Sequence, residues 1–579
     1  MKKLSIFLLS AMAAFSSCSD FLDREPLSQI SPDNFFRTEN DLKLYINSLN
    51  TTFPSAEDVY NEDIDNVVKT TLPEIVTGKR VIPVTGGGWS WTELRKVNYF
   101  MQNYNRLLQP AVTNKYMGIA RFYRAYFYQN KVMRFGDVPW YNTALSVDDT
   151  ELLNKARTPR TVVVDSIIND LDSAIMYCSV NKNVEEVTKW TALALKSRFC
   201  LFEGTFRKYH PEFNLPNANR FLQLAADASA ELMKSGYAIY KSTPEKSYLE
   251  LFAAAKANPT EIILARRFSN DLQIYHNVNY YTITASYGKP GLEKKLVNSY
   301  LMKDGTRFTD RPGYDTMTFY NECQNRDPRL AQTIRTPGYT RIGNTVKLVP
   351  DFGATTTGYQ VVKFVSEEAN DSYNKSFNDM PIFRYAEVLL NYAEAKAELG
   401  TLTQADLDAS IKLLRDRVEM PSLNLAAANA TPDPYLGAEY KNVTGTNKGV
   451  ILEIRRERRI ELVMESHRYN DIMRWKEGHL LAQQFKGMYF PGVGKYDLDN
   501  NGTVDVQIYE GTKPTEKGIQ YLKLGSEVVL ENNKGLILVN KNIDKTFNEL
   551  RDYLYPIPTQ ERLLNSNLSQ NPNWEDGIK

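Results

Sequence analysis

With 579 residues, the chain is longer than a single hydrophobic core usually serves, so we expect two or more lobes or an extended helical architecture. Its 70 basic and 69 acidic residues give a formal net charge of +1, which argues against a nucleic-acid-binding protein because such proteins normally carry a basic footprint. Hydrophobic residues at 42% and charged residues at 24% are typical of a soluble globular protein. The 35 tyrosines offer many flat amphipathic faces of the kind on which sugars stack.

The amino terminus has the pattern of an export signal. A positively charged start is followed by a mostly apolar run at 4–14, which is too short to span a membrane but suits a signal peptide. The run ends in FSSC at 15–18, which resembles a lipobox, with 1–17 as the signal and Cys18 as the acylated first residue of the mature protein. Phe15 departs from the usual aliphatic residue, and a plain secretory signal is the alternative. Acylation of Cys18 would anchor the protein to a membrane.

Apolar residues at helical spacing predict a helical scaffold in two blocks, at about 40–236 and 381–480. Trp91 is followed at this spacing by Leu94 and Val97, which favours packing over ligand binding for its ring. Further helices are predicted in the segments 118–141, 161–178, 188–206, 218–236, 381–400 and 404–418.

Between and after these blocks the helical period is lost. Residues of about 237–380 are rich in Gly, Pro, Asn and Thr, which indicates irregular structure on a scaffold. The segment of about 485–545 turns to short alternating runs, at 503–510 and 534–541, which predict strands in a small β insertion. With Cys18 in the signal, three cysteines remain, at 178, 200 and 323. A full disulfide framework is therefore excluded, whereas one disulfide stays open.

The stretch 451–476 contains strong helix formers and neither Pro nor Gly, so it predicts a helix. Its glutamates, Glu453, Glu457, Glu461 and Glu465, fall on one side of that helix, with arginines between them. We interpret the stretch as a partly buried structural helix crossed by Glu–Arg pairs. Paired catalytic carboxylates are the alternative, but alternating charges neutralise one another and a catalytic carboxylate needs a shifted pKa.

Three parts of the sequence carry a resemblance to a known family. They are EIRRERRIEL at 453–462 with the following Glu465, Arg468, Asp471 and Trp475, the opening CSDFLDREP at 18–26, and the terminal signature within 553–574. Together they resemble the SusD/RagB family of outer-membrane nutrient-binding lipoproteins. The resemblance implies a mainly α fold of tetratricopeptide-like helical hairpins with irregular loops and minor β structure. It also implies a surface lipoprotein that binds an oligosaccharide and delivers it to a SusC-like TonB-dependent outer-membrane transporter.

Motifs of common enzyme classes are missing from the sequence. There is no HExxH, GxSxG, Walker-type or GxGxxG motif, and the four histidines, at 210, 276, 467 and 479, are scattered. We therefore expect no catalysis. A surface glycosidase is an alternative, since it needs only two carboxylates at a set separation. A helical scaffold lipoprotein for outer-membrane assembly is another.

A calcium loop is the one metal motif in the sequence. Asp497, Asp499, Asn501 and Asp505 occupy its positions 1, 3, 5 and 9, with Gly502 at the turn position 6. Position 12 is Ile508, so the usual bidentate glutamate is missing. Two interpretations follow, a structural Ca²⁺ site and an Asn-Gly hairpin turn between two strands. No other cofactor is expected.

Two loops combine aromatic and polar residues in the way that sugar recognition requires. The first, at 77–91, contains Arg80, Trp89 and Trp91, with three glycines directly before Trp89. The second, at 276–289, contains Tyr280, Tyr281 and Tyr287. We predict ligand-binding roles for these six residues, with Trp89 first among them. For each aromatic residue, simple packing is the alternative, and the ligand could be a peptide instead of a glycan.

Overall fold

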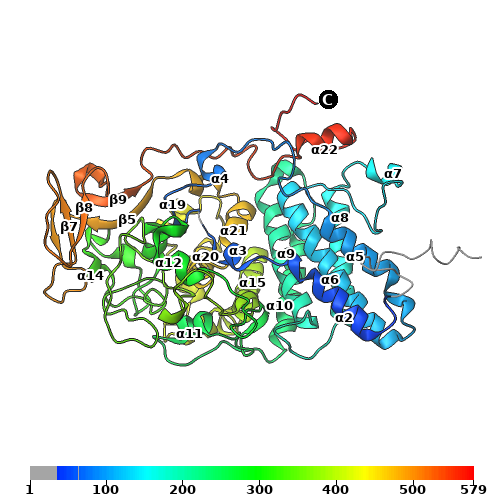
Figure 1. The fold of residues 1–579 in the computed structure, drawn as a ribbon, viewed down its shortest axis with the longest axis horizontal. Helices are drawn as coiled ribbons and strands as arrows, with labels where there is room; N and C mark the ends of the chain where they lie inside the picture. Colours follow the sequence, from blue (N-terminus) through cyan, green and yellow to red (C-terminus); the bar gives the residue numbers. More distant parts are fainter. Residues whose placement is uncertain (1–34, 63, 579) are drawn as a thin grey trace, which may run out of the picture.

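The computed structural model describes residues 35–62 and 64–578. The predicted signal peptide and the lipidation of Cys18 lie outside this part of the chain. The described part is rich in helices and has only small sheets, which confirms the predicted fold class. Figure 1 shows long helices gathered at one end, strands β5 to β9 at the other, and mostly short helices between them.

The helical end is built from α2 (Glu39–Ser48), α5 (Thr92–Asn103), α6 (Pro110–Phe135), α8 (Arg160–Tyr177), α9 (Lys189–Tyr209) and α10 (Ala218–Met233). Helix α6 packs against α5 and α8, and α9 packs against α8 and α10, so the helices stack as hairpins. Local sequence sets several ends. Pro110 is the first residue of α6, where no backbone N–H is needed, and α6 ends at Gly136 with φ +73°.

The middle of the molecule contains α15 (Tyr385–Leu399), which packs on α10 and on α20 (Lys448–Glu461). The shorter helices of the chain are α3 (Ala56–Tyr60), α4 (Glu74–Thr77), α7 (Thr150–Leu153), α11 (Ser247–Ala253), α12 (Val278–Ile283), α13 (Lys294–Ser299), α14 (Phe319–Glu322), α16 (Gln404–Asp408), α17 (Ile411–Asp416), α18 (Leu425–Ala430), α19 (Pro434–Glu439), α21 (Arg468–Arg474) and α22 (Thr559–Leu564), of which α7 and α22 lie at the helical end. Gly400 ends α15 in the left-handed conformation, with φ +77°, as a C-terminal glycine usually does.

The sheets are small. They are formed by β1 (Val67–Val68) with β3 (Gly291–Leu292), β2 (Ile262–Arg266) with β4 (Met380–Arg384), β5 (Phe485–Phe490) with β9 (Gly535–Val539), and β6 (Gly494–Tyr496) with β7 (Val506–Tyr509) and β8 (Gln520–Lys523). All pairs are antiparallel except β7 with β8. The last five strands supply the β end of the molecule in Figure 1.

The single helix predicted over 451–476 is wrong, because the structure has two helices there. Helix α20 ends at Glu461 and α21 begins at Arg468, and both Met464 and Ser466 between them have φ +62°. The break is held from the start of the chain, where the Glu62 carboxylate accepts a hydrogen bond from the Met464 N–H. Tertiary contacts with a distant segment thus override the local helix propensity.

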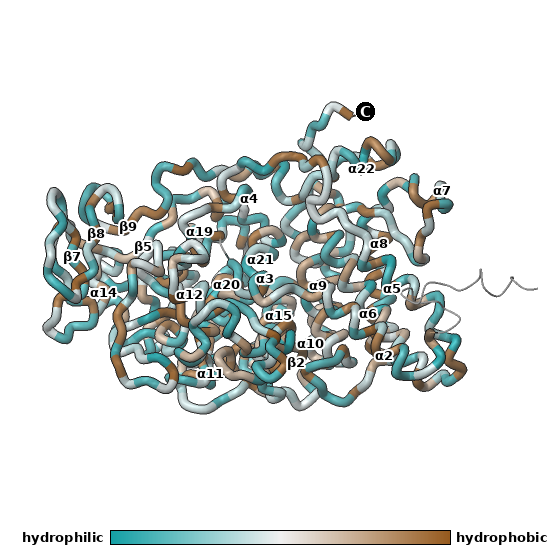
Figure 2. The backbone as a smooth tube through the Cα atoms, in the orientation of Figure 1, coloured by the Kyte–Doolittle hydropathy of each residue, from teal (hydrophilic) through white to brown (hydrophobic). Residues whose placement is uncertain are grey.

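Helix α20 is also more buried than expected. Every residue from Gly449 to Glu461 is buried, charged residues included, and Figure 2 shows a hydrophilic stretch at α20 in the middle of the molecule. Burial alone would raise the pKa of Glu461, but the guanidiniums of Arg417, Arg384 and Arg329 hold it well below its ordinary range. Such saturated carboxylates support the structural interpretation of this stretch.

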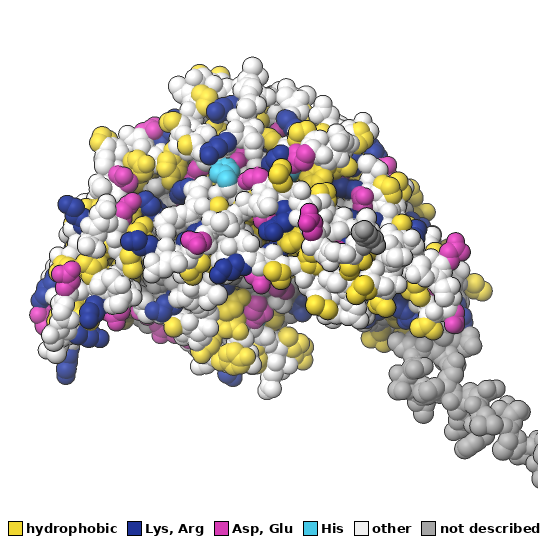
Figure 3. All heavy atoms as spheres, turned by 90° about the horizontal axis from the view of Figure 1, so that it is seen from above, with side chains coloured by type: hydrophobic (Ala, Val, Ile, Leu, Met, Phe, Trp, Pro, Cys, Tyr) yellow, Lys and Arg dark blue, Asp and Glu magenta, His cyan; other side chains and the backbone are white. Residues whose placement is uncertain are grey.

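Three features of composition and surface bear on function. Cys178, Cys200 and Cys323 are free cysteines, so no disulfide joins these three. Within the described residues, no helix combines the length and apolar character needed to cross a bilayer. Figure 3 shows basic and acidic side chains interspersed over one face without a patch of a single sign.

Candidate sugar-binding site

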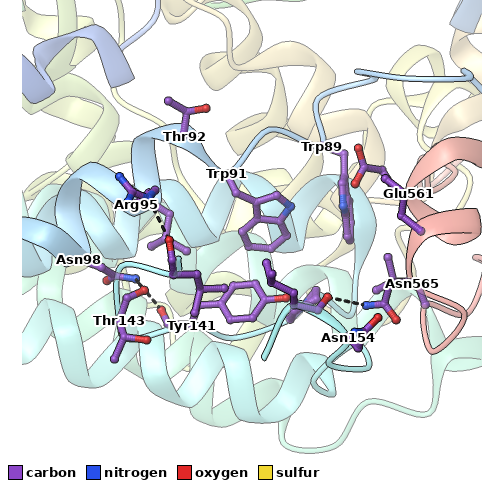
Figure 4. Close-up of a pocket in the computed structure, with 16 residues that line it drawn as sticks. Trp89, Trp91, Thr92, Arg95, Asn98, Tyr141, Thr143, Asn154, Glu561 and Asn565 are labelled. Atoms are coloured by element: carbon purple, nitrogen blue, oxygen red, sulfur yellow. Dashed lines mark hydrogen bonds between the residues drawn. The ribbon is translucent and has the colours of Figure 1, made fainter. Parts of the chain in front are cut away.

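A pocket of about 610 Å³ lies where the start of α5, the loop 139–154 and α22 meet (Figure 4). We call it the tryptophan pocket. Its lining combines aromatic, aliphatic and polar residues, namely Trp89, Trp91, Thr92, Leu94, Arg95, Asn98, Pro139, Tyr141, Thr143, Leu145, Leu153, Asn154, Glu561, Leu564, Asn565 and Leu568. Its volume falls within the range of about 300–1,000 Å³ that is usual for small-molecule sites.

Two tryptophans form one wall of the tryptophan pocket. Trp89 and Trp91 meet edge to face, with ring centroids 5.4 Å apart. Trp89 is only 5% exposed and packs on Phe135 at 4.9 Å, whereas the half-buried Trp91 packs against Tyr141 at 5.4 Å. The structure therefore brings these two predicted residues together, and it gives Trp91 the more accessible ring.

Three glycines, Gly86 to Gly88, connect the tryptophans to the rest of the loop, and we call them the glycine strap. All three have positive φ, from +54° to +87°, which side chains rarely adopt. Two side chains of α6 hold the carbonyl groups of the glycine strap. Lys131 Nζ donates to Gly88 O at 2.5 Å, and Arg134 Nε donates to Gly87 O at 3.0 Å. These hydrogen bonds fix the backbone directly before Trp89 and thus the position of its ring.

Lys131 should make stability depend on pH. Burial, followed by the nearby charge of Arg134, lowers its pKa to about 7. Between about pH 7 and pH 10.4 the unfolded chain then holds more protons at this site than the folded chain, so folding gains stability as pH rises through this window. In denaturant titrations, the free energy of unfolding of the wild type relative to that of Lys131→Met should increase as the pH rises through this window. A constant difference between the two proteins would contradict this prediction.

Hydrogen bonds to backbone carbonyls of the lining loop hold the polar side chains of the tryptophan pocket in place. The Asn98 amide donates to the carbonyls of Tyr141 and Thr143 at 3.1 and 3.0 Å, and its buried Oδ1 has no hydrogen-bond partner. Arg95 Nε donates to Leu145 O at 3.0 Å. These bonds fix the loop 139–154 onto α5. They leave the Asn98 oxygen and the remaining Arg95 nitrogens for a ligand.

The third wall comes from the end of the chain. Asn565 Nδ2 donates to the carbonyls of Leu153 and Lys155 at 3.1 and 2.9 Å, which ties α22 to the loop that carries α7. Among the described residues that line the pocket, Glu561 is the one with a carboxylate, and burial raises its pKa. Most glycosidases use a pair of carboxyl groups, whereas the described lining of this pocket supplies one.

Comparison with known proteins identifies the family. A model of the SusD family matches residues 260–574, and a second model, described as starch-binding associating with the outer membrane, matches residues 20–201. The first match alone covers more than half of the chain. The chain belongs to the SusD family. This confirms the resemblance to SusD/RagB proteins drawn from the sequence.

The similarity extends over whole SusD-like proteins. SusD-like protein P2 of Formosa agariphila is 23% identical over 512 residues, which cover 83% of this chain and 92% of that protein. A SusD-like protein from Bacteroides fragilis superposes with a TM-score of 0.69 at 22% identity, over 95% of this chain and 99% of the other. A SusD-like carbohydrate-binding protein from the same species gives 0.67 at 22% identity, over 93% and 100%. These structures support the fold.

Arg80 lies outside the lining of the tryptophan pocket in this SusD-family chain. Its Nη2 donates to the backbone oxygen of Asp552 at 2.6 Å and to Oδ1 of the same residue at 3.1 Å. The guanidinium lies over the ring of Tyr555 at 4.1 Å and near Trp574 at 5.4 Å. Its contacts pin the family's terminal signature to the loop before the glycine strap.

The three predicted tyrosines form a separate group, which we call the tyrosine cluster together with the exposed Tyr373. Tyr281 and Tyr287 stack at 4.2 Å, and Tyr280 meets Tyr373 at 5.6 Å. Lys69 Nζ lies 3.7 Å from the centre of the Tyr287 ring. None of these residues lines the tryptophan pocket. The ligand-binding roles predicted for them stay predictions.

The predicted calcium loop connects β6 to β7. A hairpin does join the two strands, since β6 and β7 are antiparallel and Tyr496 pairs with Val506, but its connection is the whole segment 497–505 and not a two-residue Asn-Gly turn. Carboxylate oxygens of Asp497, Asp499 and Asp505 lie within 4.8 Å of one another. Burial, and then the charges of Asp499 and Asp497, raise the pKa of Asp505. Asn501 Oδ1 accepts a hydrogen bond from the Thr503 N–H at 2.7 Å.

Several pocket residues were not predicted from the sequence. Tyr141 follows a segment without a predicted site residue, and Glu561 and Asn565 belong to the terminal signature, for which we predicted no ligand contact. Asn98 lies on a helix face that looked like core. The sequence gives one signal, an Asn between Val97 and Tyr99 in an apolar helix, since a buried amide needs polar partners.

Proposed function

We propose that this SusD-family protein is a cell-surface lipoprotein that binds an oligosaccharide and passes it to a SusC-like TonB-dependent outer-membrane transporter. The tryptophan pocket is the observation that carries the proposal. Aromatic rings there can pack on the C–H faces of a sugar, while Asn98, Arg95 and Asn154 offer groups for its hydroxyls. The carbohydrate-binding description of one structural neighbour agrees with this chemistry.

Location and partner rest on the family and on the amino terminus. The family model matched by 20–201 is described as associating with the outer membrane, and the lipobox-like residues end in Cys18. A protein tethered in this way can hold a captured sugar beside a transporter in the same membrane. The transfer requires reversible binding, which is tuned mainly through the dissociation rate.

Affinity electrophoresis in gels that contain polysaccharides, combined with a reducing-end assay, tests the proposed function. We expect retarded migration on at least one polysaccharide and no new reducing ends. Reducing ends that appear during incubation would instead show a glycosidase. No retardation on any glycan, together with co-purification of an outer-membrane protein, would favour the assembly scaffold. Retention of oligopeptides alone would replace sugar by peptide as the cargo.

We also propose that the loop 497–505 binds a structural Ca²⁺ ion. Three carboxylates that approach one another repel unless a cation is present, and oxygen ligands suit calcium. Adding Ca²⁺ to chelator-treated protein should therefore release binding heat and raise the melting temperature. Asp499→Asn should abolish both effects, whereas Asp315→Asn, an exposed aspartate elsewhere, should preserve them. Absence of heat and of any thermal shift in the wild type would refute the site.

A further inference from the structure

A second cavity, of about 270 Å³, lies near the middle of the molecule between α3, α6, α9 and the connection from α20 to α21. It shares no lining residue with the tryptophan pocket. We call it the Gln129 cavity, after a glutamine of α6. Its volume exceeds that of one ordered water several-fold, since a water occupies about 30 Å³. Exposed Asn130 lies among its lining residues, so the cavity opens to solvent.

The glutamine itself points to a ligand. Gln129 is 3% exposed, and its side-chain oxygen is buried without a hydrogen-bond partner. A buried polar atom without a partner costs free energy, so such atoms are normally satisfied. The neighbouring His467 lines the same cavity. Its closest carboxylate oxygen, on Glu387, is 3.9 Å from Nδ1. The half-buried Asn470 adds another amide to the same lining.

Charged groups around the cavity neutralise one another. Arg198 binds both oxygens of Glu387 at 2.6 Å, and Glu465 is paired with Arg384 at 2.5 Å and with Lys363 at 2.6 Å. Burial, and then the positive charge of Arg198, lower the pKa of His467 well below its ordinary value, so its ring is neutral at pH 7. The groups left for a ligand are therefore neutral donors and acceptors.

Part of the lining is apolar. Pro54, Val59, Met133, Pro381 and Ile382 line the cavity together with the polar groups. A purely apolar ligand would leave the Gln129 oxygen unpaired, and an ion would find no net charge to balance its own. A ring with an apolar C–H face and several hydroxyls matches both the apolar and the polar groups of this lining.

We propose that the Gln129 cavity binds one neutral, polyhydroxylated ring of the size of a single hexose unit. Its hydroxyls would bond to Gln129, His467 and Asn470, while its C–H face packs against Pro381 and Ile382. The proposal does not rest on oligosaccharide binding at the tryptophan pocket. It assigns a second ligand to a different part of the fold.

Isothermal titration with the methyl glycosides of glucose, galactose and mannose tests the assignment. We expect at least one of them to bind the wild-type protein. Gln129→Met, which keeps the side-chain length and removes both polar atoms, should weaken this binding at least about tenfold. Asn470→Leu, at a less buried position, should weaken it too, so the result does not depend on one variant folding. Trp190→Ala, at a tryptophan that lines neither pocket, should leave the binding unchanged.

Other outcomes would overturn the proposal. Crystals soaked with the same glycosides would show only ordered water in the cavity if its polar groups serve hydration alone. A folded Gln129→Met protein that binds as tightly as wild type would place the ligand elsewhere. Loss of binding in Trp91→Ala but not in Gln129→Met would assign the sugar to the tryptophan pocket. If no polysaccharide retarded the protein in affinity electrophoresis while a methyl glycoside still bound in a Gln129-dependent way, the proposed function would be refuted and the Gln129 cavity would remain a binding site.

Discussion

Replacing Arg384 by methionine should lower the free energy of unfolding by about 3–5 kcal/mol, because the change removes one partner from each of three buried carboxylates and leaves an excess negative charge far from water. Arg384 is 2% exposed and donates to Glu261 at 2.9 Å, to Glu461 at 2.8 Å and to Glu465 at 2.5 Å. Methionine can fill part of the volume, but it cannot donate a hydrogen bond. Urea titration followed by circular dichroism gives the difference.

Arg220→Met is the matched control for Arg384→Met. Arg220 pairs with Asp165 at 2.7 Å on the surface, where both side chains are about half exposed. Its loss should change the free energy of unfolding by less than about 1 kcal/mol, because water solvates both charges. If both variants lost the same small amount of unfolding free energy, the attraction within the buried pairs would do little more than offset the cost of removing their charges from water.

The size of the effect follows from a closed group of charges around α20. Its basic members are Arg329, Lys363, Arg384, Arg415 and Arg417, and its acidic members are Glu261, Asp327, Glu457, Glu461 and Glu465. The two sets balance, so the wild-type group carries no net charge. Removing one member leaves an unpaired charge far from water, which is the costly case.

Replacing Trp91 by alanine should weaken the binding of a retained oligosaccharide by at least about tenfold, which corresponds to about 1.4 kcal/mol or more. Trp91 is half-buried and forms part of the wall of the tryptophan pocket, so its ring can contact a ligand at little cost in conformational entropy. Trp89→Ala is a less direct test, since that ring also packs on Phe135. Affinity electrophoresis over a range of polysaccharide concentrations measures the change.

Two further alanine variants separate the alternatives for this site. Trp190 is a half-buried tryptophan outside the pocket, whose Nε1 donates to Val180 O at 2.8 Å, and Trp190→Ala should bind normally. Tyr281→Ala tests the tyrosine cluster. Loss of binding in Tyr281→Ala with normal binding in Trp91→Ala would move the site to that cluster.

The fold class could be predicted from the sequence because helical periodicity is a local property. The break between α20 and α21 could not. No Gly or Pro marks it, and the contacts that impose it come from Glu62 and its neighbours, far away in the sequence. The full burial of the charged residues of α20 could not be predicted for the same reason. The partners of Glu461, namely Arg329, Arg384 and Arg417, belong to other segments of the chain.

The candidate site could be predicted only in part. Trp89 and Trp91 lie close in sequence and share one pocket, whereas Arg80 from the same loop contacts Asp552 instead. The two other walls, from the loop 139–154 and from α22, meet the tryptophans only through the tertiary fold. Spacing in the sequence gives no information about such a meeting.

Helix α22 has a consequence for how the protein matures. Because Glu561 and Asn565 complete the tryptophan pocket, the pocket cannot exist until the ribosome has made this late segment and it has docked beside α5. A chain that ends shortly before Thr559 still contains all the helices of the helical end except α22. In such a chain, Trp89 and Trp91 would lack the wall that α22 supplies. The pocket is therefore among the last features that the growing polypeptide completes.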